Sequence, residues 1–156
     1  MRAVSFAHSD DASTRGHLRS RAPGAEETKA PPANIRRHTA NIRKLFAGEA
    51  IDLSNIELDL RGIGEFECEV YALTLKIPPG ETKTYGDLAR ALGDVSLSRR
   101  VGQALGRNPF PIVVPCHRVL GADGAMIGFS APGGAELKRR LLKIEGALSP
   151  DLFDLP

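Results

Sequence analysis

The sequence predicts a mainly α-helical fold with a few short β-strands. Apolar residues recur three or four positions apart in several segments, which is the spacing that places them on one face of a helix. Most of these segments end at glycine or proline residues, which stop a helix. The one apolar run with the composition of a strand, residues 110–120, contains two prolines and can therefore form only short or edge strands.

The composition is that of one ordinary globular domain. The chain has 156 residues, of which 42% are hydrophobic and 26% are charged, and these fractions exclude a wholly disordered or fibrous chain. No run approaches the ~18 apolar residues of a membrane helix, so we expect a soluble intracellular protein without membrane contact. Cys68 and Cys116 are too few for a disulfide scaffold or a structural zinc site. The net charge of +2 neither requires nor excludes a polyanionic partner.

Both ends of the chain are predicted to lie outside a main body formed by residues 63–146. Residues 1–33 are mostly polar and contain three prolines, which predicts a disordered tail. In residues 34–62, apolar side chains at helical spacing predict a helix over about 34–47, and a linker follows it. Residues 147–156 are predicted to form an acidic tail.

The main body begins with a predicted helix. Phe66, Val70, Leu73 and Ile77 follow one helical stripe, and the helix must stop at Pro78 because proline cannot continue the hydrogen-bond ladder. This helix is therefore expected to bury one face against the rest of the domain.

Two short helices around Gly93 are predicted next. Thr84 and Asp87 have the spacing of a capping box at the start of the first helix, and Ser96 or Ser98 can cap the second. The pair could be a helix-turn-helix, although any two packed helices give this pattern. A last helix completes the body, and its basic residues 138–140 are interpreted as a solvated face, with contact to a polyanion as the alternative.

Cys116 is the candidate nucleophile. A lone cysteine in an apolar run is most often a small buried hydrophobe. Here it stands between Pro115 and the basic pair His117 and Arg118, where the apolar run ends and a glycine-rich loop begins. Rigid placement close to positive charge lowers the pKa of a thiol and exposes a reactive thiolate. Because adjacent residues point to opposite sides of an extended chain, His117 could need a bridging water to reach Cys116.

The run NPFPIVVPCHRVLGADG, centred on PCHR, resembles the active-site signature of the O6-alkylguanine-DNA alkyltransferases. The resemblance extends upstream through FECEVYALTLKIPPGETKTYGDLA and SRRVGQALGRNP and downstream to KRRLLKIEG, so it covers about residues 66–146. It implies a winged-helix-like DNA-binding alkyltransferase domain. It also implies irreversible, single-turnover transfer of an alkyl group from O6-alkylguanine in DNA to a cysteine, without cofactor or metal, and O4-methylthymine is expected as a further substrate.

The resemblance assigns catalytic and pocket roles to particular residues. Cys116 would accept the alkyl group, and His117 would act as its base through a water. Glu145 would orient the imidazole, and Asn108 would hold the active-site turn. The substrate pocket would be lined by Pro111, Phe129 and Ser130.

The resemblance likewise implies that a monomer binds the minor groove of double-stranded DNA and flips the alkylated base. Tyr85 would rotate the 3′ phosphate, and Arg99 would fill the gap left in the base stack. Ser98 and Gly102 are small enough for a helix that enters the narrow groove, whereas Arg100 is bulkier and is expected to reach a phosphate. The expected location is the cytoplasm with its nucleoid in a prokaryote, or the nucleus in a eukaryote.

Three features depart from the family pattern. Phe129 stands where the family commonly has a tyrosine, so the hydroxyl donor is missing unless Ser130 supplies one, and the loop is two residues longer. The N-terminal domain of relatives is reduced to the helix over 34–47, as a remnant. The zinc site of some relatives is absent, because no cysteine precedes Cys68, and His8, His17 and His38 are expected at the surface.

Two other classes of function remain open at this stage. The chain could be an alkyltransferase-like sensor that binds lesions with little or no transfer, although in such proteins the cysteine is replaced. It could also be a thiol hydrolase or redox protein that uses Cys116 and His117, which would not need Arg99 or the helix pair.

Overall fold

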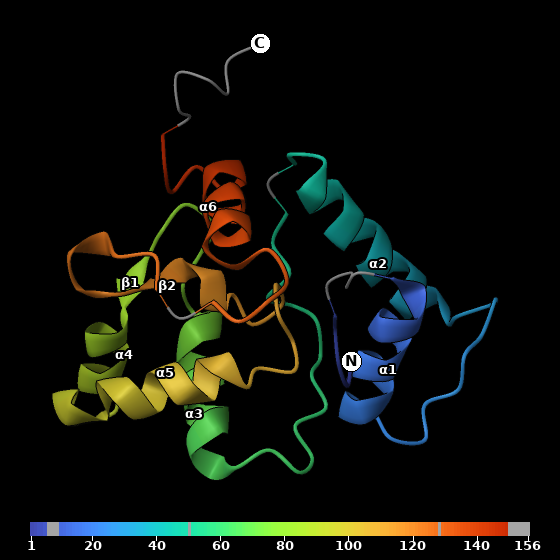
Figure 1. Cartoon of the computed structure of the whole chain (residues 1–156), viewed down its shortest axis with the longest axis horizontal. Coiled ribbons are helices and arrows are strands. Elements are labelled where there is room, and N and C mark those ends of the chain that lie inside the picture. The colour runs from blue at the N-terminus through green and yellow to red at the C-terminus, as the bar shows by residue number, and fades with distance from the viewer. Residues whose placement is uncertain (6–9, 50, 128, 150–156) are drawn as a thin grey trace.

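The computed structural model describes residues 1–5, 10–49, 51–127 and 129–149. Six α-helices and one two-stranded sheet occur in this part of the chain (Figure 1). The helices are α1 (Asp11–Arg21), α2 (Ala33–Phe46), α3 (Glu65–Leu75), α4 (Tyr85–Ala91), α5 (Ser98–Gly106) and α6 (Gly134–Ile144). The strands are β1 (Lys83–Thr84) and β2 (Val119–Leu120), and short 3-10 turns are η1 (Val95–Leu97), η2 (Cys116–Arg118) and η3 (Ala122–Gly124). The predicted fold class, mainly α with short strands, is confirmed.

The core lies where α3, α4 and α5 pack together and α6 closes over the segment 110–120. Val70 of α3 and Val101 of α5 are wholly buried there, and Phe110 joins them from the segment after α5. The Tyr71 hydroxyl donates to the carbonyl of Ala104 at 3.1 Å, which satisfies the polar end of a buried ring. The apolar stripe predicted for the first helix of the body thus faces the core.

The start of α4 is fixed by a complete capping box and by the sheet. The Thr84 side chain accepts from the Asp87 amide at 3.0 Å, and the Asp87 carboxylate accepts from the Thr84 amide at 2.8 Å, as the sequence predicts. Thr84 also pairs in parallel with Leu120 of β2. This register brings the first turn of α4 beside the segment that follows Cys116.

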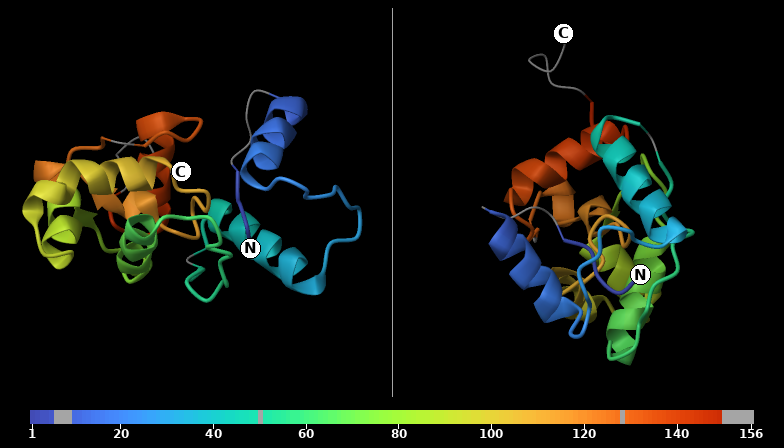
Figure 2. Two further views of the ribbon diagram at one scale, coloured as in Figure 1. Left: turned by 90° about the horizontal axis from the view of Figure 1, so that it is seen from below. Right: turned by 90° about the vertical axis from the view of Figure 1, so that its right-hand side faces the viewer.

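The N-terminal region differs from the predicted tail, because α1 lies within it. Asp10 caps α1 by accepting from the Ser13 amide at 2.7 Å, but α1 has no buried residue. The chain before α1 is tied to the main body by the Val4 amide, which donates to the carbonyl of Pro109 at 2.9 Å. The cap of α1 and the hydrogen bond of Val4 are polar interactions, so the low apolar content of this region did not predict them. Figure 2 shows α1 and α2 on the opposite side of the molecule from α4 and α5.

The remaining domain limits stay predictions. The helix predicted over 34–47 corresponds to α2, whose Leu45 reaches the core. Within the predicted tail 147–156, residues 150–156 lie outside the described residues, as does His8. Among the helices that the structure describes, none is long and apolar enough to cross a membrane.

Candidate active site

A tight turn after α5 positions Cys116, and Asn108 holds this turn together. The buried Asn108 amide donates to the carbonyl of Val114 at 3.0 Å, and its oxygen accepts from the Phe110 amide at 2.9 Å. Within the turn, Ile112 has a φ of 76°, which is costly for a β-branched residue. The Asn108 bridges therefore stabilise a strained loop whose exit leads directly into η2.

Cys116 is half-buried at the start of η2, and its side chain lines a cavity. Burial raises the pKa of its thiol, while the Asn108 side chain and the charge of Lys138 oppose this rise. The sequence predicts the reverse, a lowered pKa, from the two basic neighbours. The structure shows why that prediction is wrong for the resting protein: those neighbours turn toward Glu145, and desolvation of the sulfur dominates.

His117 and Glu145 form a buried pair. Nε2 of His117 lies 3.0 Å from Oε1 of Glu145, and their side chains are 0% and 1% exposed. Burial alone would raise the pKa of Glu145, but hydrogen bonds from Arg118 and His117 outweigh it and lower the value to about 2. An ionised carboxylate only accepts hydrogen bonds, so Nε2 must carry the proton of the ring. Nδ1 is then the basic nitrogen, and it has no hydrogen-bond partner among the described residues.

Lys138 is a residue of the site that the sequence interpretation missed. The structure turns it inward, where its Nζ donates to the carbonyls of Val119 at 2.6 Å and Ile127 at 3.0 Å. Burial lowers its pKa to about 8. Arg139 and Arg140 remain exposed, so the solvated-face interpretation is wrong for Lys138 alone. Its spacing of seven residues from Glu145 on one helix is the signal that could have found it.

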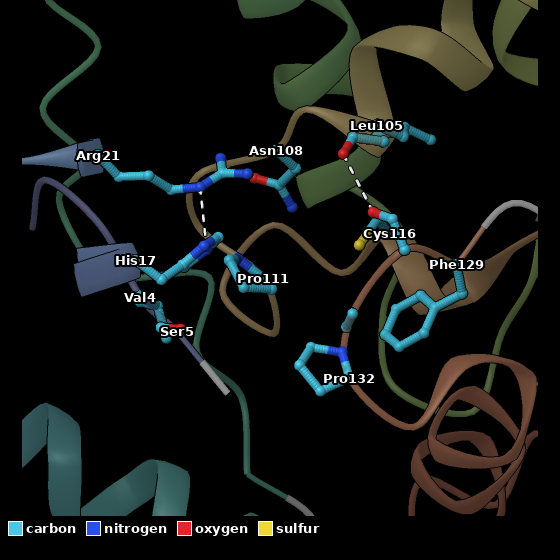
Figure 3. A pocket seen from close by; sticks show the side chains of 13 residues that line it. Val4, Ser5, His17, Arg21, Leu105, Asn108, Pro111, Cys116, Phe129 and Pro132 are labelled. Carbon is cyan, nitrogen blue, oxygen red and sulfur yellow. Dashed lines mark hydrogen bonds between the residues drawn. The ribbon is translucent and has the colours of Figure 1, made fainter. Parts of the chain in front are cut away.

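The cavity beside Cys116 has a volume of about 80 Å³ (Figure 3). Residues of the main body and residues of the N-terminal region both line it. It contains the predicted residues Asn108, Pro111, Cys116, Phe129 and Ser130. The Ser130 hydroxyl donates to the carbonyl of Gly106 at 3.1 Å, which holds the loop after Cys116 against the end of α5.

The opposite wall of this cavity comes from the N-terminal region, including His17 and Arg21 of α1. Arg21 donates through Nη1 to the carbonyl of Arg107 at 3.0 Å and through Nε to Nε2 of His17 at 3.1 Å. His17 is therefore half-buried in the wall of the cavity. Nothing in the sequence indicated this contact, because it joins residues 86 positions apart.

The residues expected to contact DNA lie on α4 and α5. Tyr85 connects this face to the cavity loop, because its hydroxyl donates to the carbonyl of Ile127 at 3.2 Å and its ring lies beside Gly102. Ser98 and Arg99 are at the first turn of α5, and the Ser98 hydroxyl donates to the carbonyl of Val95 at 2.6 Å. Arg100 stacks its guanidinium 3.8 Å above the ring centre of Phe66, while Arg99 is exposed.

No group of three or more metal-ligating side chains occurs in the part of the chain that the structure describes.

Together, fold and site define a small helical domain with a paired-helix face and a cysteine backed by a buried histidine and glutamate. Residues 65–147 match the family model of the 6-O-methylguanine DNA methyltransferase DNA-binding domain, and the chain belongs to this family.

Relatives span several organisms. A methylated-DNA-protein-cysteine methyltransferase of Mycobacterium bovis is 46% identical over 112 residues, which cover 70% of this chain and 66% of that protein. One of Methanosarcina acetivorans is 42% identical over 114 residues, covering 72% and 70%. The chain thus spans slightly less than two thirds of the length of the first relative.

Solved structures agree with the family assignment. Mycobacterium tuberculosis OGT in complex with DNA is 43% identical, with a TM-score of 0.63 over 70% of this chain and 65% of that one. The O6-methylguanine-DNA methyltransferase of Pyrococcus kodakaraensis is 34% identical, with a TM-score of 0.64 over 92% and 85%. The alkyltransferase fold is therefore shared with proteins at identities well above chance.

Proposed function

We propose that the protein repairs DNA by moving the alkyl group of an O6-alkylguanine onto Cys116. The observation that supports this most directly is the position of Cys116 at a cavity, next to a buried histidine whose second ring nitrogen is bound by an ionised carboxylate. Methylated-DNA-protein-cysteine methyltransferases are relatives of this chain, which supports the same reaction class.

The transfer would begin with the thiol proton of Cys116, which moves through a water to Nδ1 of His117. The thiolate then attacks the alkyl carbon, a C–S bond forms, and the bond from that carbon to O6 breaks. Guanine leaves with the electron pair on O6 and takes up the proton that His117 received, so that the imidazole and the released guanine are both neutral. Because the thioether cannot be hydrolysed at neutral pH, each molecule reacts once. The raised pKa of the Cys116 thiol means that the proton acceptor is needed at the moment of reaction.

The alkylated base would reach Cys116 by leaving the DNA duplex. Arg99 is exposed at the first turn of α5 and is long enough to occupy the place of an extruded base. Tyr85 lies between α5 and the loop that lines the cavity, because its ring is beside Gly102 and its hydroxyl donates to the carbonyl of Ile127. From this position it would rotate the 3′ phosphate of the same nucleotide. Arg100, stacked on Phe66, would contact a phosphate. We propose that the protein binds the minor groove as a monomer. O4-methylthymine would be a second substrate, and the protein would act in the compartment that holds the DNA.

The intact mass of the protein after incubation with an O6-methylguanine oligonucleotide tests this function. We expect one added methylene mass, located on Cys116 by peptide mapping and absent from Cys116→Ser. Arg99→Ala should slow transfer from duplex DNA more than transfer from the free modified base. Equal slowing of both would contradict the base-flipping role of Arg99.

A lesion-binding sensor with little transfer is the second candidate. It is favoured by Phe129, which puts a ring without a hydroxyl at the cavity, and by the burial that raises the pKa of Cys116. Tight binding of the modified oligonucleotide without any gain in protein mass would establish this function instead.

A further inference from the structure

Arg118 is buried beside the proposed acceptor cysteine, yet the transfer steps above give it no part. Its Nε and Nη2 each donate to a different carboxylate oxygen of Glu145 at 2.8 Å. Its Nη1 donates to the carbonyl of Ile77 at 2.5 Å, which anchors the guanidinium to the segment just after α3. Two-point pairing of this kind fixes the plane of a carboxylate as well as its position.

The oxygen that Arg118 fixes is the one that His117 uses. Oε1 of Glu145 accepts from Nη2 of Arg118 and lies 3.0 Å from Nε2 of His117. A carboxylate held in this way can accept a hydrogen bond from the N–H at Nε2 but cannot rotate toward Nδ1. The geometry therefore selects one tautomer of the imidazole.

The charge of Arg118 limits how strongly Glu145 favours an imidazolium. A lone carboxylate beside a histidine stabilises the protonated ring, whereas one already paired with a guanidinium stabilises it less. Burial lowers the pKa of His117, the hydrogen bond from Glu145 opposes this, and the charges of Arg118 and Lys138 lower it further. The net direction is downward, so the ring is neutral near pH 7.

We infer that Arg118 is a positioning residue that locks Glu145 against His117 and keeps the His117 ring neutral, with Nδ1 able to accept the proton of Cys116. Proton acceptance rests on the proposed function, whereas the state of the ring does not. The two can therefore be tested separately.

Other charged groups lie around this cluster. Lys138 comes from α6, Glu145 is the C-cap of the same helix, and Cys116 comes from η2. Asp52, in the segment between α2 and α3, has a lowered pKa that is due first to hydrogen bonds from Ser54 and only last to the charge of Arg118. Among the described cations, Arg118 is the one hydrogen-bonded to Glu145, because Lys138 donates to the carbonyls of Val119 and Ile127. Its replacement is thus the direct way to change the charge next to His117.

The experiment compares Arg118→Met, Arg118→Lys and the control Arg61→Lys in the full chain. Methionine keeps much of the volume and removes the charge, while lysine keeps the charge but cannot reach both carboxylate oxygens. Arg61 pairs with Asp59 at the surface and is 83% exposed, so it matches the arginine-to-lysine change outside the site. Two quantities are measured against pH: the ring protonation of His117 by heteronuclear NMR, and the single-turnover transfer rate with a methylated oligonucleotide.

In Arg118→Met we expect His117 to titrate about one pKa unit higher, and the acid limb of the rate profile to move by the same amount, which makes transfer up to about tenfold slower on that limb. Arg118→Lys should shift both by less, and Arg61→Lys should shift neither. If both Arg118 variants lose stability but keep the His117 titration and the rate profile in place, Arg118 is only structural and the inference is overturned.

Arg118→Lys decides the question if the methionine variant does not fold. The NMR titration also separates this inference from the proposed function. A protein that transfers no alkyl group to Cys116 would refute the function, and a shifted His117 titration in the variants would still support the role of Arg118.

Discussion

The site region and the N-terminal region hold their charges in opposite ways. In the first, the paired Arg118 and Glu145 side chains are 8% and 1% exposed, and Glu145 also binds His117. In the second, the ion pairs are at the surface, and Arg15 and Glu27 are 50% and 58% exposed. Buried charges are costly unless every partner is present, whereas exposed pairs contribute little. Among the described residues, the buried Arg118–Glu145 pair thus lies at the candidate active site, whereas the Arg15–Glu27 pair of the N-terminal region is exposed to solvent.

The largest expected effect is the difference in unfolding free energy between Glu145→Ala and Glu27→Ala. Without Glu145, the guanidinium of Arg118 is left buried without a counter-charge, so we expect a loss of about 3–5 kcal/mol in unfolding free energy. The same change at Glu27 removes an exposed pair and should cost less than about 1 kcal/mol. Urea denaturation at neutral pH measures both, and equal losses would show that the two regions do not differ as described.

The unfolding free energy should also depend on pH because of the buried groups of the site region. The pKa of Glu145 is about 2 in the folded protein against an ordinary 4.5, so its contribution is complete above about pH 4.5 and is lost as the pH falls toward 2. The pKa of His117 is also lowered by burial, so stability should begin to fall below its ordinary value of 6.5. Denaturation curves over this range measure the slope.

Glu145→Gln should flatten the part of the curve between pH 4.5 and 2. Glu136→Gln is the matched control, because it makes the same change on the same helix at a side chain that is 83% exposed. A curve that keeps its full slope in Glu145→Gln would place the acid sensitivity elsewhere.

Phe129→Tyr tests the cavity side of the site region. A phenol hydroxyl at this position can donate to the departing guanine oxygen, which is worth about 1–3 kcal/mol in the transition state, so transfer should accelerate up to about 100-fold. Single-turnover rates with the methylated oligonucleotide measure this. Phe46→Tyr, on α2, is the control and should leave the rate unchanged. An unaltered rate in Phe129→Tyr would mean that the missing hydroxyl does not limit the reaction.

Sequence pattern predicted the helices that bury an apolar stripe and missed the one that does not. The capping box at Thr84 and the stripe through Val70 are local signals, and both appear in the structure. By contrast, α1 has no buried residue, so its amino acids look like those of a tail. Helices whose order depends on caps and distant hydrogen bonds leave little trace in hydrophobic periodicity.

The site shows the same division. The PCHR motif pointed to Cys116 and His117, the IEG motif pointed to Glu145, and the structure brings His117 and Glu145 within hydrogen-bonding distance. It gave no part to Arg118, whose partners are 27 and 41 positions away along the chain. Burial of a charged side chain depends on such distant partners, which is why local composition predicted a lowered thiol pKa for Cys116 and was wrong.

The smallest predicted effect concerns the contact between the two regions. Arg21→Ala removes the hydrogen bond to the carbonyl of Arg107, and we expect a loss of at most about 1.5 kcal/mol in unfolding free energy. Because Arg21 lines the cavity beside Cys116, the smaller side chain should also widen it. Transfer of a benzyl group should then gain relative to transfer of a methyl group, as measured by the ratio of their single-turnover rates. Arg19→Ala, at an exposed position two residues away on α1, should leave this ratio unchanged. Equal ratios in both variants would mean that Arg21 lines the cavity without affecting which alkyl group is transferred. The N-terminal region would then differ from the site region in function as well as in the exposure of its charges.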